Sequence, residues 1–330
     1  MIETRHLRTL RAVAQTGSFA AAARQLSCTQ PAVSQQMKSL ELAMGTPLLI
    51  RTSREVRVTE AGAALVRHSA GVLAGLHAAE EEMAAFAGLR TGRVRLASFL
   101  SGTSALIPSA IAAVRAAHPD IEVSLVEAPL PRSIDLLRNA DCDISLAFHH
   151  PKIPGAGAKT QDEWRDLAVR PLLTDPLVVL VPEGHRLAEA DQVELAELAD
   201  DSWVMGCHRC RHHLVQLCEH AGFEPRAEYR TDDYPTVIGL VAAGLGVAVL
   251  PELALSEPPS TAIRLLRLEP TVHREVVALS MSTSLSVPAV GLMLRELERS
   301  AARLPRTSPN PPPPSTESRR GEASKARLLI

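Results

Sequence analysis

Six side chains that can bind a metal ion or take part in redox chemistry lie within twelve positions, at residues 207–218. They are Cys207, His208, Cys210, His212, His213 and Cys218. Thiolate and imidazole groups bind soft metal ions, and reactive thiols are oxidised to disulfides. Arg209 and Arg211 oppose metal binding because their charges would lie beside the ion, and no second CxxC pair follows. We therefore expect these residues to pack in the fold or to line a ligand site, without a metal or other cofactor. Redox sensing and metal binding are the alternatives.

The spacing of Cys210 and Cys218 bears on the redox alternative. A helix over residues 210–218 would separate them by about 12 Å of rise. A disulfide needs Cα atoms about 4.4–6.8 Å apart, so this bond would require the helix to unfold.

No arrangement of residues typical of an enzyme stands out elsewhere. The sequence has no nucleophilic-serine motif, no phosphate-binding glycine loop and no pair of carboxylates at a useful spacing. His149 and His150 are expected in a loop at the mouth of a cleft rather than in a catalytic dyad. Cys28 is expected to pack within a turn. The sequence therefore favours a protein that is not an enzyme.

Length and composition limit the class of protein that carries these residues. The 330 residues suffice for two or three modules, and the 46% of hydrophobic residues can form a core. No apolar run reaches the roughly 18 residues that a membrane span needs. The first six residues contain no apolar signal segment, and five cysteines do not indicate a disulfide framework. We expect a soluble cytoplasmic protein.

The charge is distributed unevenly along the chain. The whole chain has 35 basic and 37 acidic residues, a net charge of −2. Residues 1–58 hold eight basic and three acidic residues, so this end carries +5 and the remainder −7. A basic module joined to an acidic body is typical of a protein whose one end binds nucleic acid.

The first sixty residues predict three short helices. Gly17 is placed to end the first helix, and Ser18 to cap the second. Thr29 is placed to cap the third, with Pro31 in its first turn, where a missing N–H costs nothing.

The third predicted helix has two different faces. Val33, Met37 and Leu40 recur at spacings of four and three, which predicts a buried stripe. The other face is small and polar, and consists of Gln30, Pro31, Ser34, Gln35 and Lys38. Such a face suits insertion into a DNA groove, where base edges offer hydrogen bonds.

Two short strands are predicted after the helices, at residues 49–50 and 56–58. Arg51 and Arg54 lie in the turn between them, where a winged helix-turn-helix would place them near phosphates or in the minor groove. Residues 1–58 are therefore predicted to be a winged helix-turn-helix DNA-binding domain. An ordinary three-helix module with a solvated loop is the alternative.

Residues 59–88 predict one long linker helix. Apolar and small residues recur at alternating steps of four and three, as in a coiled coil. They are Leu65, Ser69, Val72, Leu76, Ala79, Met83 and Phe86. A single helix cannot bury this seam, so we expect two copies of the chain to pair through it and to present two basic modules to two half-sites.

Beyond a glycine-containing hinge at residues 88–92, strand and helix patterns alternate. Strands are predicted at 94–98, 121–127, 143–148, 177–181, 203–205, 227–229, 246–250 and 276–281. Helices are predicted at 103–117, 133–139, 211–221, 235–243 and 290–303. This order indicates two α/β lobes with mostly parallel sheets and a ligand cleft between them. We assign 89–303 to this domain, with one lobe at about 92–166 and 268–303 and the other at 167–267. The proline-rich residues 304–330 are expected to be disordered.

Several segments resemble the LysR-type transcriptional regulators. In the first sixty residues they are LRTL (7–10), GSFAAAA (17–23), TQPAVSQQMKSLE (29–41), GTPLLIR (45–51) and VTEAG (58–62). Further along, AHPDIEV (117–123) and VAAGLGV (241–247) are similar to the effector domain of that family. The resemblance covers about 1–303, and only the tail lies outside it.

The resemblance implies a homo-oligomer, usually a tetramer built as a dimer of dimers, that binds interrupted palindromes in promoter DNA. It implies activation or repression controlled by a small molecule in the cleft between two lobes of the periplasmic-binding-protein type. RNA polymerase is a further candidate partner. The matching DNA contacts are Gln30, Pro31, Ser34, Gln35, Lys38, Arg51 and Arg54. Many relatives carry Arg where Gln35 stands, so the half-site read here is expected to differ.

The resemblance also places an effector site. The matching residues are Ser98, Ser101, Thr103, Ser104, Phe148, Gly206, Cys207, His208 and Asp233. Thr103 or Ser104 could instead merely cap a helix, and Asp233 disfavours a highly anionic effector. Peroxide-sensing relatives carry a redox cysteine pair in this segment; Cys218 matches one position, but the partner position is displaced. A solute-binding protein and an enzyme of unfamiliar type are the competing hypotheses of other classes.

Overall fold

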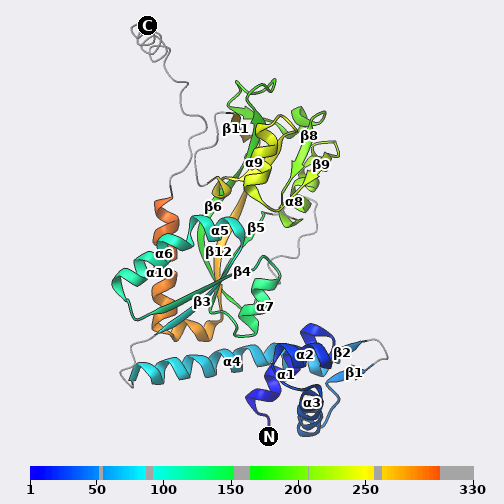
Figure 1. Cartoon of the computed structure of the whole chain (residues 1–330), viewed down its shortest axis with the longest axis vertical. Coiled ribbons are helices and arrows are strands. Elements are labelled where there is room, and N and C mark those ends of the chain that lie inside the picture. The colour runs from blue at the N-terminus through cyan, green and yellow to red at the C-terminus, as the bar shows by residue number, and fades with distance from the viewer. Residues whose placement is uncertain (52–54, 87–91, 152–163, 207, 256–261, 305–330) are drawn as a thin grey trace, which may run out of the picture. The chain divides into compact units, whose positions relative to one another are not determined.

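A computed structural model describes residues 1–51, 55–86, 92–151, 164–206, 208–255 and 262–304 (Figure 1). The chain divides into two compact units, each described by itself below. Unit 1 contains the described residues of 1–148, 159–173 and 276–302. Unit 2 contains those of 149–158, 174–275 and 303–330. The tail beyond residue 304, Arg54 and Cys207 lie outside the described residues.

The N-terminal module of unit 1 has three helices and a two-stranded sheet. These are α1 (Thr4–Thr16), α2 (Phe19–Gln25), α3 (Gln30–Met44), β1 (Leu49–Arg51) and β2 (Val56–Val58). Gly17 ends α1 in the left-handed conformation, at φ 63°. Ser18 caps α2 and Thr29 caps α3, each accepting a hydrogen bond from a backbone N–H three residues on. The predicted caps are therefore confirmed, and the sheet is antiparallel with Leu49 opposite Val58.

The linker helix α4 (Glu60–Phe86) follows without interruption and belongs to unit 1. Ala70 and Ala74 are buried in the hydrophobic core cluster that also contains Leu137 and Leu279 of the following α/β lobe. The face of α4 used for this packing differs from the predicted seam. Val72 and Met83 of that seam are 52% and 57% exposed in the single chain.

The α/β lobe of unit 1 is built on parallel strands. Strand β3 (Arg93–Ser98) lies between β4 (Glu122–Glu127) and β5 (Ile144–His149) and is parallel to both. The helices of this lobe are α5 (Leu100–Ala105), α6 (Ile107–Ala117), α7 (Arg132–Arg138) and α10 (Pro288–Arg303), with the 3₁₀ turn η4 (Ser282–Ser286). One helix was predicted over 103–117, but the structure has two, because Pro108 lacks an N–H and occupies the first turn of α6.

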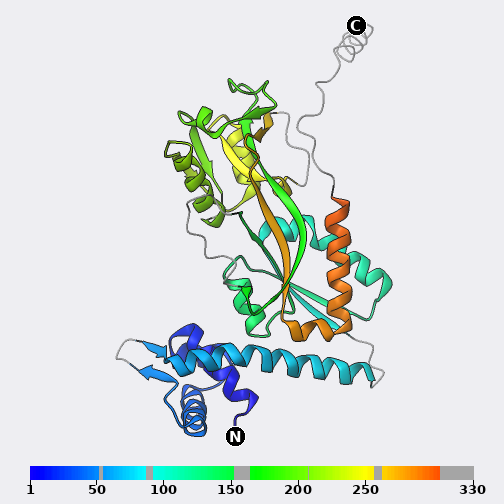
Figure 2. The same cartoon turned by 180° about the vertical axis from the view of Figure 1, so that it is seen from behind.

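Unit 2 contains the remaining strands and helices, and it shares two of them, β6 and β12, with unit 1. The strands are β6 (Ala168–Pro182), β7 (Gln192–Val193), β8 (Ser202–Met205), β9 (Arg226–Arg230), β10 (Ala248–Pro251), β11 (Ile263–Leu268) and β12 (His273–Ser280). The helices are α8 (His208–His220) and α9 (Tyr234–Ala242), with 3₁₀ turns η2 (Leu195–Leu198) and η3 (Glu252–Ala254). Strands β6 and β12 are neighbours in the sheet and continue into unit 1 (Figure 2).

The sheet of unit 2 departs from the predicted pattern. Strands β8 and β9 are parallel, as expected, but β6 pairs antiparallel with both β10 and β11. The expectation of mostly parallel pairing is therefore wrong around β6. The sequence analysis also missed β7 and β11. No helix among the described residues is long and apolar enough to cross a membrane.

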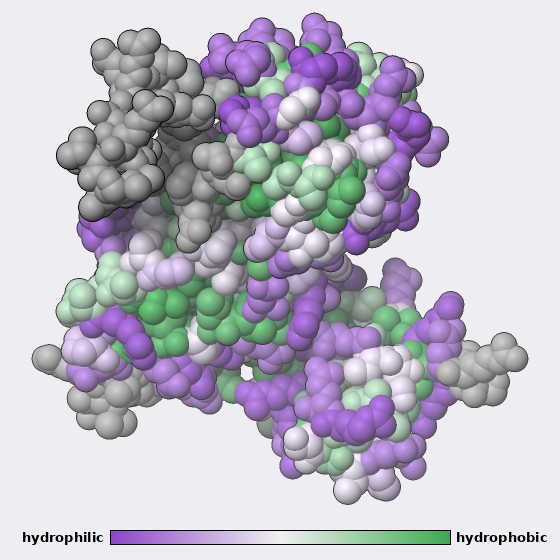
Figure 3. Space-filling model, turned by 45° about the horizontal axis from the view of Figure 1, so that its top comes forward, coloured by the Kyte–Doolittle hydropathy of each residue, from purple (hydrophilic) through white to green (hydrophobic). Residues whose placement is uncertain are grey.

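The surface is not uniformly polar. On the face drawn in Figure 3, green hydrophobic areas lie between extensive purple hydrophilic ones. The most exposed large hydrophobic residues outside the terminus include Leu42 on α3, Ile50 on β1 and Val72 and Met83 on α4. The exposed apolar positions on α4 coincide with the seam predicted for pairing.

Candidate nucleic-acid interface and ligand site

Helix α3 is held in the N-terminal module by one face only. Val33, Met37 and Leu40 are fully buried there, at 0% exposure. The Thr9 hydroxyl on α1 donates a hydrogen bond to the amide oxygen of Gln36, which ties α3 to its neighbour. This packing fixes the direction of the opposite face and leaves it in solvent.

The opposite face of α3 carries the predicted DNA contacts. Gln30, Pro31, Gln35 and Lys38 are exposed, and Ser34 is half-buried. Within the part of the chain that the structure describes, the side chains of Gln30, Gln35 and Lys38 make no hydrogen bond or ion pair. Their amide and ammonium groups are therefore available to an external partner that offers both donors and acceptors, as base edges and phosphates do.

The sheet after α3 positions one further cation of the predicted set. The Arg51 guanidinium at the end of β1 lies over the Phe19 ring, 4.8 Å from its centroid, a cation–π contact that restrains the side chain. Arg57 on β2 pairs with Glu55 at 2.6 Å. Arg54, predicted at the tip of this hairpin, lies outside the described residues.

Part of the predicted effector set comes together in unit 1, where β3 ends and α5 begins. Ser98 and Ser101 are fully buried at 0% exposure, and the Phe148 ring packs edge-on against Phe99 with centroids 4.9 Å apart. Gly102 is required here, because a Cβ at this position would lie 2.9 Å from the Phe99 ring. Small residues and aromatic rings thus pack tightly around the serines.

The hydroxyl groups of Thr103 and Ser104, which follow on α5, differ in their hydrogen bonding. Thr103 Oγ1 is buried and has no hydrogen-bond partner among the described residues. Ser104 is exposed, and its hydroxyl donates to the Ser101 carbonyl at 3.2 Å. Neither residue caps α5, whose N-cap is Phe99, so the alternative in which they serve only as helix caps is wrong. An unpaired buried hydroxyl is costly, and a bound polar ligand or water would remove that cost.

The other predicted effector residues belong to unit 2. Gly206 follows β8, and His208 begins α8, but the side chain of His208 and all of Cys207 lie outside the described residues. Asp233 is the N-cap of α9, and its carboxylate accepts from the Thr236 N–H at 3.0 Å and the Thr236 hydroxyl at 2.5 Å. These bonds lower the pKa of Asp233. The sequence analysis did not foresee this capping role.

The cysteines differ in exposure. Cys210 and Cys218 both lie on α8, which confirms the helix that separates them. Cys218 is fully buried, and burial raises its pKa to about 12. Cys28 is exposed, so the expectation that it packs within the turn is wrong. Among the described residues, no three His, Cys, Asp or Glu side chains gather as metal ligands would, and Cys207 lies outside that search.

Two contacts in unit 2 escaped the sequence analysis because they join residues far apart in the chain. His149 is the last residue of β5 and not part of a loop, whereas His150 lies outside any helix or strand, as expected. The rings of His150 and His213 stack with centroids 3.9 Å apart, so His150 is packed against α8. Burial, with a smaller contribution from His212, lowers the pKa of His213 to about 4. Arg274 and Asp175 form a buried ion pair. No local pattern in the sequence marks either contact.

Two family models match the chain. "Bacterial regulatory helix-turn-helix protein, lysR family" matches residues 4–63, and "LysR substrate binding domain" matches residues 87–302. The chain is 32% identical over 266 residues to the HTH-type transcriptional regulator ShiR of Corynebacterium glutamicum, covering 79% of this chain and 86% of ShiR. It is 30% identical over 257 residues to the regulator AlsR of Bacillus subtilis, covering 77% and 82%.

Solved structures share the fold. A full-length OxyR variant from Pseudomonas aeruginosa matches with a TM-score of 0.66 and 21% identity, covering 94% of this chain and 99% of that one. Full-length CbnR in complex with its target DNA matches with a TM-score of 0.50 and 22% identity, covering 91% and 100%. Together with the exposed polar face of α3 and the two family models, these similarities lead to one conclusion: the chain belongs to the LysR family and is a DNA-binding transcriptional regulator with an effector-binding domain.

Proposed function

We propose that this regulator reads DNA through the exposed face of α3. Gln30 and Gln35 contact base edges, with Pro31 and Ser34 packed against the groove, while Lys38, Arg51 and Arg54 contact phosphates. The observation that carries the proposal is that Gln30, Gln35 and Lys38 are exposed and make no hydrogen bond or ion pair within the described residues. Side-chain amides can bond bidentately to adenine, and ammonium groups suit phosphate.

The DNA-binding unit is a dimer paired through α4, and two dimers form a tetramer. The stripe of Val72, Leu76 and Met83 supports this pairing, because these apolar side chains are 52%, 37% and 57% exposed in the single chain. Pairing would remove them from water. Two modules related by two-fold symmetry read an interrupted palindrome in promoter DNA, where RNA polymerase is a further partner.

A small molecule controls DNA binding from the effector domain. In unit 1 the residues proposed to contact it are Ser98, Ser101, Thr103, Ser104 and Phe148. In unit 2, Gly206, Cys207, His208 and Asp233 stay candidate contacts from the sequence. Support comes from the buried hydroxyl of Thr103, which has no partner among the described residues, and from the LysR substrate-binding model that spans this domain. The role is regulatory rather than catalytic, and DNA as the partner places the protein in the cytoplasm.

The proposal is tested by a mobility-shift titration of the full-length protein on the DNA immediately upstream of its own gene. Specific binding should weaken steeply between 50 and 200 mM salt, by about 10³-fold if six phosphates are contacted. A Lys38→Ala variant should bind more weakly and with a shallower salt slope. Arg115→Ala, an exposed arginine on α6, serves as the matched control and should bind as the wild type does.

A second titration uses random genomic fragments, to allow for an operator that lies elsewhere. Binding to neither DNA, or binding that Lys38→Ala leaves unchanged, would contradict the proposed interface. Running both titrations with and without reductant also addresses the redox alternative, because only a thiol-dependent regulator should respond to reductant.

A further inference from the structure

A pocket of about 240 Å³ lies in unit 2 between α8 and β9. Its apolar floor includes Met205, at the end of β8, and Val215, on α8. The charged and polar part of its wall consists of Glu224, of Arg211 and His212 on α8, and of Arg230 on β9, and Pro225 and Ala227 also line it. None of these residues belongs to the effector set proposed above, so the pocket has a lining of its own.

The charges around this pocket are left unpaired by the fold. Among the described residues, the side chains of Arg211, His212, Arg230 and Glu224 make no hydrogen bond or ion pair. Two guanidinium groups, from α8 and β9, thus line one hollow with a single carboxylate. Even with Glu224 counted, the wall carries an excess of positive charge.

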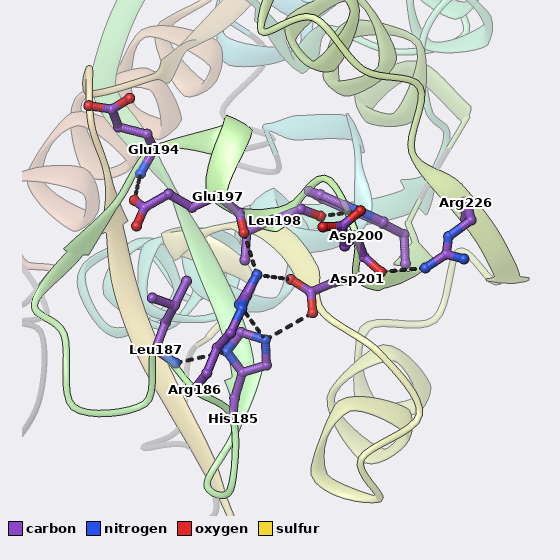
Figure 4. A network of polar contacts seen from close by, with 10 residues as sticks. His185, Arg186, Leu187, Glu194, Glu197, Leu198, Asp200, Asp201 and Arg226 are labelled. Carbon is purple, nitrogen blue, oxygen red and sulfur yellow. Dashed lines mark hydrogen bonds and ion pairs between the residues drawn. The ribbon is translucent and has the colours of Figure 1, made fainter.

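Elsewhere in unit 2, a network of hydrogen bonds and ion pairs joins charged side chains to partners within the chain. There Asp201 accepts from His185 Nε2 at 3.1 Å and from Arg186 Nη2 at 3.0 Å (Figure 4). Arg226, next to the pocket in sequence, donates to the Asp200 carbonyl. These cations have partners within the chain, whereas Arg211 and Arg230 line a pocket and their side chains have no partner among the described residues.

We propose that this pocket binds a small organic anion with one carboxylate or phosphate group on a short apolar body. The planar guanidinium groups of Arg211 and Arg230 each present paired N–H donors that match the oxygens of such a group. The side chains of Val215 and Ala227, which also line the pocket, cover the apolar body. The Glu224 carboxylate repels a second acidic group, which favours a ligand with one acidic group over a dicarboxylate. The regulator thereby has a second ligand site in its effector domain.

Isothermal titration calorimetry of the full-length protein tests this site. The probes are phenyl phosphate and benzoate, which share a ring and differ in the anionic group, and benzamide is the neutral analogue. At least one anion should bind in 50 mM salt, and benzamide should not. Arg211→Ala and Arg230→Ala should each weaken binding about tenfold or more, since each removes charge-assisted hydrogen bonds.

Arg267→Ala is the matched control, because Arg267 is an exposed arginine of β11 in the same unit that does not line the pocket. It should leave the affinity unchanged. Binding of neither anion at 10 mM would overturn the proposal, as would equal affinity in the wild type and in the Arg211→Ala/Arg230→Ala double variant. All variants should still shift promoter DNA without ligand, so a failure here is distinguishable from a failure of the proposed DNA interface.

Discussion

Arg274 and Asp175 form an ion pair that is buried on both sides. Arg274 Nε on β12 donates to Asp175 Oδ2 on β6 at 2.8 Å, and the two side chains are 0% and 2% exposed. The other carboxylate oxygen accepts from the Leu253 N–H at 2.9 Å. Burial raises the pKa of Asp175, and Arg274 and the Leu253 N–H partly oppose this. The pair therefore holds together two strands and the turn at η3, and the three residues involved all lie in unit 2.

Removing one partner of this pair should destabilise the protein strongly. Asp175→Asn would leave the buried Arg274 charge without its counter-charge, at a cost of about 3–5 kcal/mol in the free energy of unfolding. Urea unfolding at neutral pH measures this cost. Arg170→Ala, which removes an exposed pair with Glu298, is the control and should cost about 0–1 kcal/mol. The double variant Asp175→Leu/Arg274→Met should lose less free energy of unfolding than the two single variants lose together. Equal losses would contradict the coupling of the two residues.

Base reading and phosphate binding should separate in the variants of the DNA-binding domain. Gln30→Ala should lose about 1–3 kcal/mol of discrimination at one base pair, because a bidentate contact to a base edge is removed. Arg54→Ala should weaken binding to all sequences alike and reduce the salt slope by about one. A panel of operator mutants measured by mobility shift distinguishes them. Equal loss of discrimination in both variants would contradict the separate roles of Gln30 in base reading and Arg54 in phosphate binding.

The exposed stripe of α4 should control the oligomeric state. Val72→Glu places a charge in the predicted seam and should shift the protein toward monomers, because burying that charge in a helix pair is costly. Sedimentation velocity of the full-length protein measures the shift. Leu245→Glu, at a leucine that is 40% exposed in unit 2, is the control and should leave the assembly intact. An unchanged sedimentation coefficient for Val72→Glu would rule out pairing through α4.

The buried His213 should make stability depend on pH. Its pKa is lowered from 6.5 to about 4 by burial and, to a smaller extent, by His212. Between these values the unfolded chain binds a proton that the folded chain does not, so stability falls as the pH drops from about 6.5 toward 4. His213→Phe, which keeps a ring for stacking on His150, should flatten this part of the profile. Thermal unfolding at half-unit pH steps tests it, and identical slopes in both proteins would contradict the assignment to His213.

The cysteines should differ in reactivity. Cys218 is fully buried with a pKa of about 12, so its thiolate is scarce and inaccessible at neutral pH. Iodoacetamide should therefore label the exposed Cys28 readily in the folded protein and label Cys218 only after unfolding. Peptide mass spectrometry reads out both sites in one sample. Rapid labelling of Cys218 in the folded protein would show that α8 opens, and would favour the redox alternative.

Local chemistry accounts for the parts of the fold that were predicted well. Gly17, Ser18 and Thr29 act within a few residues of their own positions. The C-terminal end of α1 and the N-terminal ends of α2 and α3 could therefore be predicted from the sequence. The buried stripe of Val33, Met37 and Leu40 follows from helical periodicity, and with it the exposure of Gln30, Gln35 and Lys38. For this reason the exposed face of α3 could be predicted from the sequence, whereas its contacts with DNA stay a prediction.

Predictions failed where distant residues decide the outcome. The strands β7 and β11 are held by pairing with each other, 70 or more residues apart, and the antiparallel partners of β6 are equally remote. The stacking of His150 on His213 and the pairing of Asp175 with Arg274 depend on the same long-range packing. Caps and periodicities act through neighbouring residues, whereas burial and charge pairing depend on which segments the folded chain brings together. The family and the exposed face of α3 could therefore be recognised in the sequence, while the pocket lined by residues of α8 and β9 depends on the tertiary structure.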